Sequence, residues 1–195
     1  MIEESDPVFK MAELLGELDY RELRGTYRRR WRSISPEIMF SIVVYANMKG
    51  IYSSRGIEEA CRTDIRFMWL LQYRKAPDHT TISRFLENNM SGCAEDLFYQ
   101  LIEKLAEMGE IDFKALFVDG TKIEANANSY TFVWVKAVEK RLKKQDYGFR
   151  RFLTRGKKNN ETRLFILAVA FNIQKLCSRI ANGRFGKSLF ELKTA

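Results

Sequence analysis

Hydrophobic residues three and four positions apart recur from residue 8 to about residue 110, a spacing that predicts amphipathic helices. The pattern breaks at Gly50, at Pro77 and at Ser91-Gly92, where glycine, proline or serine favours a turn. These breaks predict several short helices, and we see no internal repeat among them. We therefore expect a helical N-terminal domain over residues 1–110.

Several of these helices should begin at a residue that can cap a helix N-terminus. Ser35 stands directly before Pro36, and Ser53 or Ser54 precedes an amphipathic stretch. Asp78 is in the same position before a further short helix over residues 78–89. The local sequence thus predicts where three helices start.

The segment 78–89 divides into an apolar and a polar face. Ile82, Phe85 and Leu86 predict the buried face. The outward residues are of the kinds that a helix in the DNA major groove uses for phosphates and base edges: Thr80, Thr81, Ser83, Arg84, Glu87 and Asn88. We expect a helix-turn-helix-like part in which Ser83, Arg84 and Asn88 contact DNA. The alternative is the solvated face of an ordinary bundle, with His79 making a local hydrogen bond rather than binding a metal.

The pattern changes near residue 113. Residues 113–119 and 129–134 are rich in β-branched and aromatic residues, which predicts a pair of strands, and the first ends at Asp119. From residue 136 the chain reads as helical, and residues 160–180 predict an amphipathic helix with one apolar face. That face contains Leu164, Leu167, Ala168, Phe171 and Leu176. The expected fold class is mostly α, with a second region over residues 111–195.

The net charge of +8 at pH 7 favours a polyanionic partner, and nucleic acid is the first candidate. The excess gathers in residues 136–158, which hold ten lysines and arginines against two acidic residues and include Tyr147, Phe149 and Phe152. Cations beside aromatic rings are suited to backbone contact and base stacking. The candidate DNA contacts are Arg150, Arg151, Arg155, Lys157 and Lys158. The alternative is again a solvated charged face.

Other features of the sequence indicate where in the cell the protein is located. The three cysteines stand far apart and there is one histidine, so we expect neither a zinc cage nor a disulfide framework. The acidic N-terminus does not resemble a signal peptide, and the longest apolar run, residues 164–171, is far shorter than the roughly 20 residues that cross a bilayer. We expect a cytoplasmic protein that does not enter a membrane.

Three segments resemble bacterial insertion-sequence transposases of the DDE class. V-D-G-T-K-I-E-A-N-A-N-S-Y-T-F-V-W, residues 118–134, is similar to the first catalytic strand of that family. Residues 53–85, which end in A-P-D-H-T-T-I-S-R-F, are similar to its N-terminal helical domain, and residues 146–180 are similar to its C-terminal end. The family has a ribonuclease H-like core in which two aspartates and a glutamate hold Mg²⁺ for DNA cleavage and strand transfer.

The resemblance assigns the first of those carboxylates, both as catalytic group and as metal ligand, to Asp119. No match to the second aspartate or to the glutamate follows it, and Glu139 resembles a different segment of the family. The resemblance therefore implies an internally deleted transposase, with the junction near residues 141–145 and with Mg²⁺ held weakly if at all. Such a chain is expected to bind DNA at transposon ends, with self-association left open.

Two alternatives come from other classes. One is a residual nuclease that uses Asp119 with Glu124 or Glu139. In a regular strand, residues 119 and 124 point to opposite faces because their separation is odd, which disfavours that pair. The other is a helical interaction protein whose basic surface has no role in DNA binding.

Overall fold

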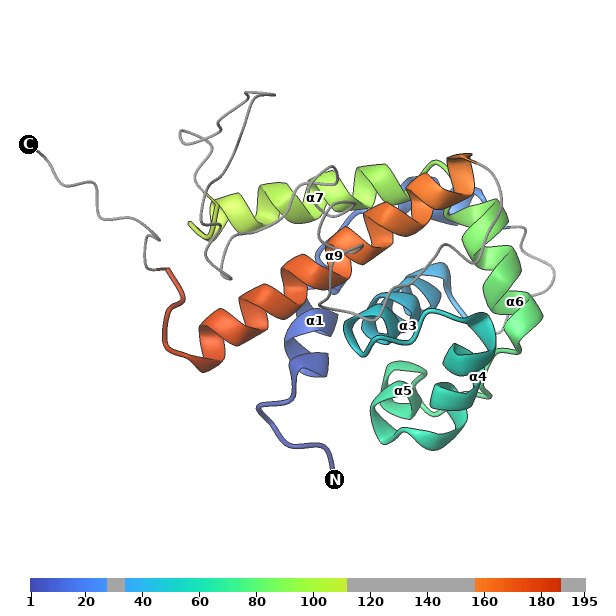
Figure 1. The fold of residues 1–195 in the computed structure, drawn as a ribbon, viewed down its shortest axis with the longest axis horizontal. Coiled ribbons are helices and arrows are strands. Elements are labelled where there is room, and N and C mark those ends of the chain that lie inside the picture. The colour runs from blue at the N-terminus through green and yellow to red at the C-terminus, as the bar shows by residue number, and fades with distance from the viewer. Residues whose placement is uncertain (28–33, 112–156, 187–195) are drawn as a thin grey trace, which may run out of the picture.

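The computed structural model describes residues 1–27, 34–111 and 157–186, and the regular structure in these ranges is helical (Figure 1). The elements are α1 (Pro7–Gly16), α2 (Arg21–Gly25), α3 (Pro36–Met48), α4 (Ser54–Thr63), α5 (Ile65–Leu70), α6 (His79–Arg84), the π-helical turn η1 (Phe85–Asn89), α7 (Ala94–Glu107) and α9 (Lys157–Ala181). The mostly helical fold class is confirmed for this part of the chain. The expected strand pair, with Asp119, lies outside the described residues.

The predicted caps are present at the helix starts. Ser35 Oγ accepts a hydrogen bond from the Ile38 N–H at 3.4 Å, and Ser53 Oγ accepts from the Gly56 N–H at 3.0 Å. Each cap satisfies an N–H group that has no partner inside its own helix. Helix α3 ends at Met48, and Gly50 follows with a φ of 74°, a left-handed conformation that glycine adopts without steric cost.

Helix α9 runs through the middle of the molecule and packs against α1, α3 and α7, with α4 and α5 on the side of α3 away from α7 (Figure 1). Every residue from Ile166 to Ile173 is buried. Eight consecutive residues cover all sides of a helix, so the expectation of a single apolar face over 160–180 is wrong. The predicted positions, Leu164 among them, are buried, but so are Ile166, Val169 and Ala170 between them.

A buried ion pair ties the far end of α9 to the end of α7. The Arg179 guanidinium donates from Nε to Glu110 Oε2, and the two side chains are 3% and 0% exposed. The other Glu110 oxygen accepts from the Gly186 N–H at 2.7 Å. One carboxylate therefore fixes α7, α9 and the turn after α9 to one another.

Helix α9 is also long and apolar enough, over Lys158–Ala181, to cross a membrane by length and composition. In the structure, 61% of the most apolar 18-residue stretch of this helix is buried inside the protein. A core helix of a soluble protein meets the same criteria, so this feature is weak evidence for a membrane span.

Candidate nucleic-acid interface

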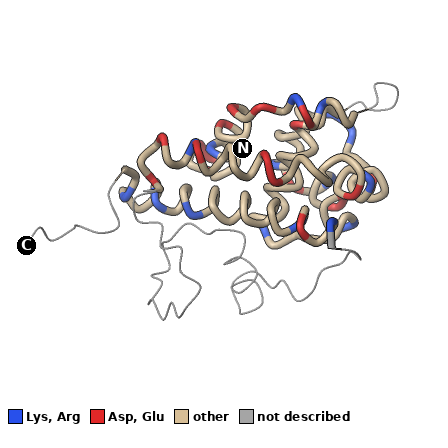
Figure 2. Tube along the Cα trace, turned by 90° about the horizontal axis from the view of Figure 1, so that it is seen from above, with Lys and Arg blue, Asp and Glu red and all other residues tan. Residues whose placement is uncertain are grey.

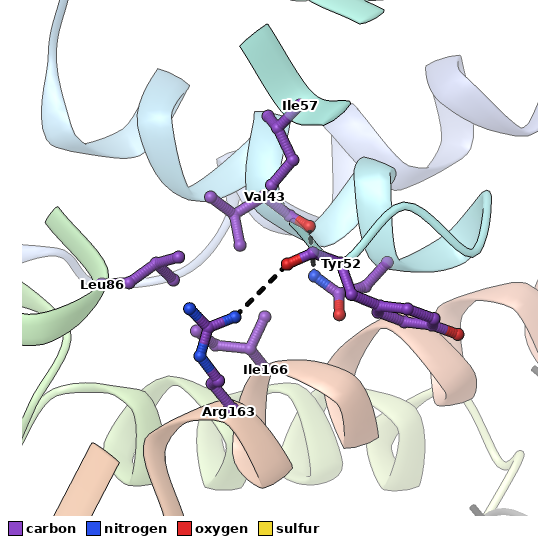
Figure 3. A pocket seen from close by; sticks show the side chains of 7 residues that line it. Val43, Tyr52, Ile57, Leu86, Arg163 and Ile166 are labelled. Carbon is purple, nitrogen blue, oxygen red and sulfur yellow. Dashed lines mark hydrogen bonds between the residues drawn. The ribbon is translucent and has the colours of Figure 1, made fainter. Parts of the chain in front are cut away.

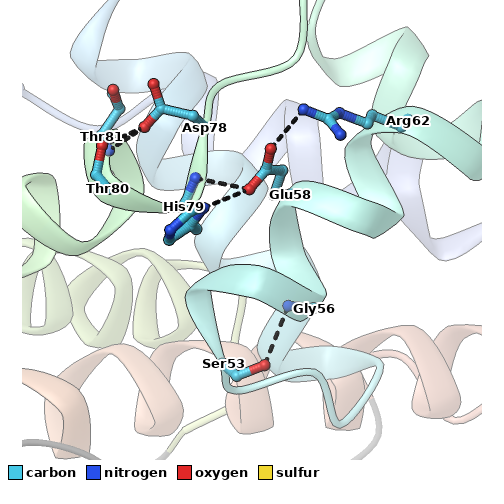
Figure 4. Close-up of polar contacts among 8 residues, drawn as sticks. All are labelled: Ser53, Gly56, Glu58, Arg62, Asp78, His79, Thr80 and Thr81. Atoms are coloured by element: carbon cyan, nitrogen blue, oxygen red, sulfur yellow. Dashed lines mark hydrogen bonds and ion pairs between the residues drawn. The ribbon is translucent and has the colours of Figure 1, made fainter.

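Helices α6 and η1 form one continuous segment over residues 79–89, and Asp78 caps it. Its Oδ1 atom accepts from the Thr81 N–H at 2.7 Å and from the Thr80 hydroxyl at 2.6 Å (Figure 4). The hydrogen bonds from Thr80 and Thr81 lower the pKa of the Asp78 carboxyl to about 2. Its negative charge lies at the positive end of the helix dipole, which also favours it.

A second carboxylate fastens the start of α6 to α4. Glu58 Oε2 accepts from the His79 N–H at 2.9 Å and lies 2.8 Å from His79 Nδ1, while Arg62 donates to the other oxygen at 2.5 Å (Figure 4). Hydrogen bonds from the His79 ring and backbone lower the pKa of Glu58. His79 therefore makes a hydrogen bond as the sequence favoured, but to a residue 21 positions away rather than to a local partner, and this bond fixes where α6 starts.

The inward side of the segment anchors it in the core. Ile82 and Phe85 are 0% exposed and Leu86 is 3% exposed, as predicted. At the far end, Asn89 Nδ2 donates to the Thr26 carbonyl at 3.0 Å and to its hydroxyl at 3.1 Å. Both ends and one face are thus held by specific contacts, which makes the opposite face a rigid surface.

The outward side carries the predicted contact residues. Arg84 and Asn88 are exposed, and Ser83 is half-buried with its hydroxyl donating to Glu87 Oε1 at 3.1 Å. Between Arg84 and Asn88 the helix widens into a π-turn, in which the Met90 N–H donates to the Phe85 carbonyl at 3.0 Å. Such turns occur frequently at functional sites because they change the direction of the side chains that follow.

The link before α6 differs from a typical helix-turn-helix. Helix α4 packs against α6, but α5 stands between them in the chain and residues 71–78 then lead to α6. The usual motif has a turn of three to four residues. The arrangement is therefore a packed helix pair with a longer connection.

The first turns of α9 lie beside η1 (Figure 1). Lys157 begins α9, and Lys158 is exposed. The structure thus brings the start of α9 to the same end of the molecule as Asn88. Arg150, Arg151 and Arg155 lie outside the described residues, as does Asp119.

Charge is evenly mixed over the described helices, with basic and acidic residues interspersed (Figure 2). The described ranges contain slightly more Asp and Glu than Lys and Arg. The excess of positive charge therefore belongs to residues 28–33, 112–156 and 187–195. The α6–η1 surface offers hydrogen-bonding groups rather than a strong positive field.

A small hollow behind η1 contains Arg163 of α9, a residue that we did not single out from the sequence (Figure 3). Its Nη1 donates to the Tyr52 carbonyl at 3.4 Å, and burial lowers the pKa of the guanidinium, opposed by the charge of Glu87. The hollow has room for about one water molecule, so it does not fit a nucleotide or substrate. A lone arginine in the apolar sequence T-R-L-F-I-L was the available signal.

Among the described residues, no group of three or more His, Cys, Asp or Glu side chains could hold a metal ion. A three-carboxylate site of the kind that the resemblance implies is therefore not assembled within residues 1–27, 34–111 and 157–186. The expectation of a metal ligand therefore rests on Asp119 alone, which lies outside the described residues.

Comparison with known proteins finds a family model that matches part of the chain. Residues 1–88 match the family model described as "Transposase domain (DUF772)", a range that runs from before α1 almost to the end of η1. Neither a curated protein nor a solved structure matches the chain.

Proposed function

Because the domain that matches residues 1–88 supports a transposase family, we propose that this chain is a transposase-family protein that binds DNA through the α6–η1 surface. The observation that carries the proposal is the position of Arg84 and Asn88, which are exposed on a segment fixed at both ends. A cytoplasmic location, where a transposase meets bacterial DNA, belongs to the same proposal.

Two parts of the chain contribute differently to DNA binding. Affinity for DNA comes mainly from cations that displace counterions from phosphates, and the excess of cations lies in the basic tract 136–158, with Lys157 and Lys158 at the start of α9. Groups on a rigid helix instead fix orientation and read base edges. We assign the first role to the tract and the second to Ser83, Arg84 and Asn88.

We further propose that the chain does not cleave DNA. The family chemistry uses three carboxylates around Mg²⁺, and this sequence matches only the first, at Asp119. A single carboxylate holds Mg²⁺ weakly because the hydrated ion gives up its water reluctantly. An internal deletion near residues 141–145 explains the loss, and a longer relative or terminal inverted repeats beside the coding sequence would test it.

The test for binding is fluorescence anisotropy with duplex DNA over a range of salt concentrations. Arg84→Ala should weaken binding and, if Arg84 touches a phosphate, should reduce the salt slope by about one. Lys104→Ala removes an equal charge from the far part of α7 and should have little effect. Equal losses in both variants would contradict a specific α6–η1 contact, and salt-independent or absent binding would favour the helical interaction protein.

The test for cleavage uses the intact chain with labelled transposon ends and either Mg²⁺ or Mn²⁺. We expect no nicking, and we expect Asp119→Asn to bind DNA as the parent chain does. Nicking that requires the metal and disappears in Asp119→Asn would show that a working metal site survives.

A further inference from the structure

The connection from α5 to α6 holds two consecutive residues in an unfavourable backbone conformation. Gln72 has a φ of 54° and Tyr73 a φ of 58°, a region that residues with a side chain rarely adopt. The conformation closes the end of α5, because the Gln72 N–H donates to the Trp69 carbonyl and the Tyr73 N–H to the Met68 carbonyl, both at 2.9 Å. Helices commonly close this way with glycine at the first of these positions.

The same connection projects an aromatic ring into solvent. The Tyr73 side chain is 74% exposed, and Gln72, Arg74 and Lys75 are exposed around it. Leu71, at 1% exposure, anchors the turn in the core. The ring is therefore held outward by a fixed backbone rather than carried on a loose loop.

The positive φ at Tyr73 costs stability, and the ring lies outside the core, so packing does not explain a tyrosine at this position. A glycine at position 73 would adopt the observed φ freely and would expose no apolar ring. Strained backbone that persists in this way is typical of residues with a function.

We propose that Tyr73 stacks on an unpaired base of DNA, with Arg74 and Lys75 beside the phosphates of the same strand. A protruding ring flanked by cations is the combination that binds single-stranded nucleic acid, since every base offers an aromatic face. Bases inside a duplex are already stacked on their neighbours, so an exposed ring finds a free face only where pairing ends. This inference rests on the DNA binding proposed above and adds the kind of DNA that the chain prefers.

The position of the connection fits this contact. Residues 71–78 lead directly into α6, and Pro77 is buried before the Asp78 cap. Figure 1 shows α5 at the edge of the molecule next to α4, on the side of α3 away from α9. Tyr73 therefore lies in the connection that leads into the segment proposed to contact duplex DNA.

The experiment measures anisotropy of the full chain on a blunt duplex and on the same duplex with a single-stranded overhang. Tyr73→Ala should weaken binding to the overhang duplex by at least about fivefold, the lower limit for one stacked base, and should leave blunt-duplex binding unchanged. Tyr73→Phe keeps the ring and should bind as the parent chain does. Tyr99→Ala removes a 47% exposed tyrosine from α7 and should alter neither affinity.

Tyr73→Gly separates the contact from any loss of folding. It removes the ring and relieves the backbone, so it should raise the melting temperature while weakening overhang binding as much as Tyr73→Ala does. If the parent chain binds blunt duplex and Tyr73→Ala binds both probes normally, the inference is wrong and the proposed function stands. If the parent chain binds neither probe, the proposed function itself fails.

Discussion

At the scale of single residues, Phe85 is the buried anchor of the α6–η1 surface. Its ring is 0% exposed and lies 6.2 Å from the ring of Tyr27 in an edge-on arrangement. The residues on either side of it in sequence, Arg84 and Leu86, point outward and inward respectively, so the ring sets how the helix is turned against the core.

Phe85→Ala should lower the free energy of unfolding by roughly 3 to 5 kcal/mol, because it leaves a cavity that the surrounding helices cannot fill. Urea denaturation measures the loss. Phe185→Ala is the matched control, since Phe185 is 47% exposed and should change stability little. A loss at Phe85 as small as that at Phe185 would place the ring outside the core.

The Asp78 cap should make the free energy of unfolding depend on pH in the acidic range. Its pKa is about 2 in the folded chain and near its ordinary value of 3.8 when unfolded. Because the folded pKa is the lower one, the contribution is fully present above pH 3.8 and is lost as the pH falls towards 2. Asp78→Asn retains a capping oxygen but does not titrate there, so its unfolding free energy should fall less between pH 4 and pH 2 than that of the parent chain. Parallel pH profiles would contradict the assignment.

At the scale of elements, the residues at which helices start were predictable, but the contacts between one helix and another were not. Ser35, Ser53 and Asp78 each cap an N–H group three residues away, so the signal is local in the sequence. The contact of Glu58 with His79 spans 21 residues and depends on how α4 meets α6. The π-turn at η1 depends on the core below it, and no residue pattern in F-L-E-N-N marks it.

Helix α9 shows the same limit more strongly. Its residues predicted a helix, and the helix is present, but the one-face interpretation was wrong because α1, α3 and α7 surround it. Those neighbours precede α9 by some fifty residues or more. Asn172, which is 0% exposed, illustrates the difficulty, since a polar residue in the middle of a helix is typically assigned to the surface.

The ion pair between α7 and α9 should be costly to break from one side. Arg179→Met leaves the Glu110 carboxylate buried without its cation, and the loss of unfolding free energy should be about 3 to 5 kcal/mol. The double variant Glu110→Leu with Arg179→Met removes both charges and should recover much of that loss. Thermal unfolding of both variants measures the difference, and equal destabilisation would mean that the pair's hydrogen bonds matter more than its charge.

At the scale of the whole molecule, the described helices share one core. Buried residues from Val8 to Leu105 and from Leu164 to Leu176 belong to the same apolar cluster. The predicted division at residue 110 therefore separates segments that pack against each other. The matched range 1–88 likewise leaves out α7 and α9, although α9 packs against both α3 and η1.

A fragment of residues 1–111 should consequently fail to fold cooperatively, because the apolar faces of α1, α3 and α7 lack α9. Circular dichroism should show reduced helix content and a broad thermal transition. A peptide of residues 157–186 added in trans should restore both, whereas a chain shortened only by residues 187–195 should behave as the parent does. A fragment 1–111 with a sharp transition of its own would refute the shared core.

The central position of α9 also sets the time at which the protein can form during synthesis. A ribosome adds about 5–20 residues per second, and roughly 65 residues separate Ile111 from Leu176. The N-terminal helices therefore wait for about 3 to 13 s with their apolar faces uncovered. In that interval the nascent chain is a substrate for chaperones and open to association with its neighbours on the same messenger RNA.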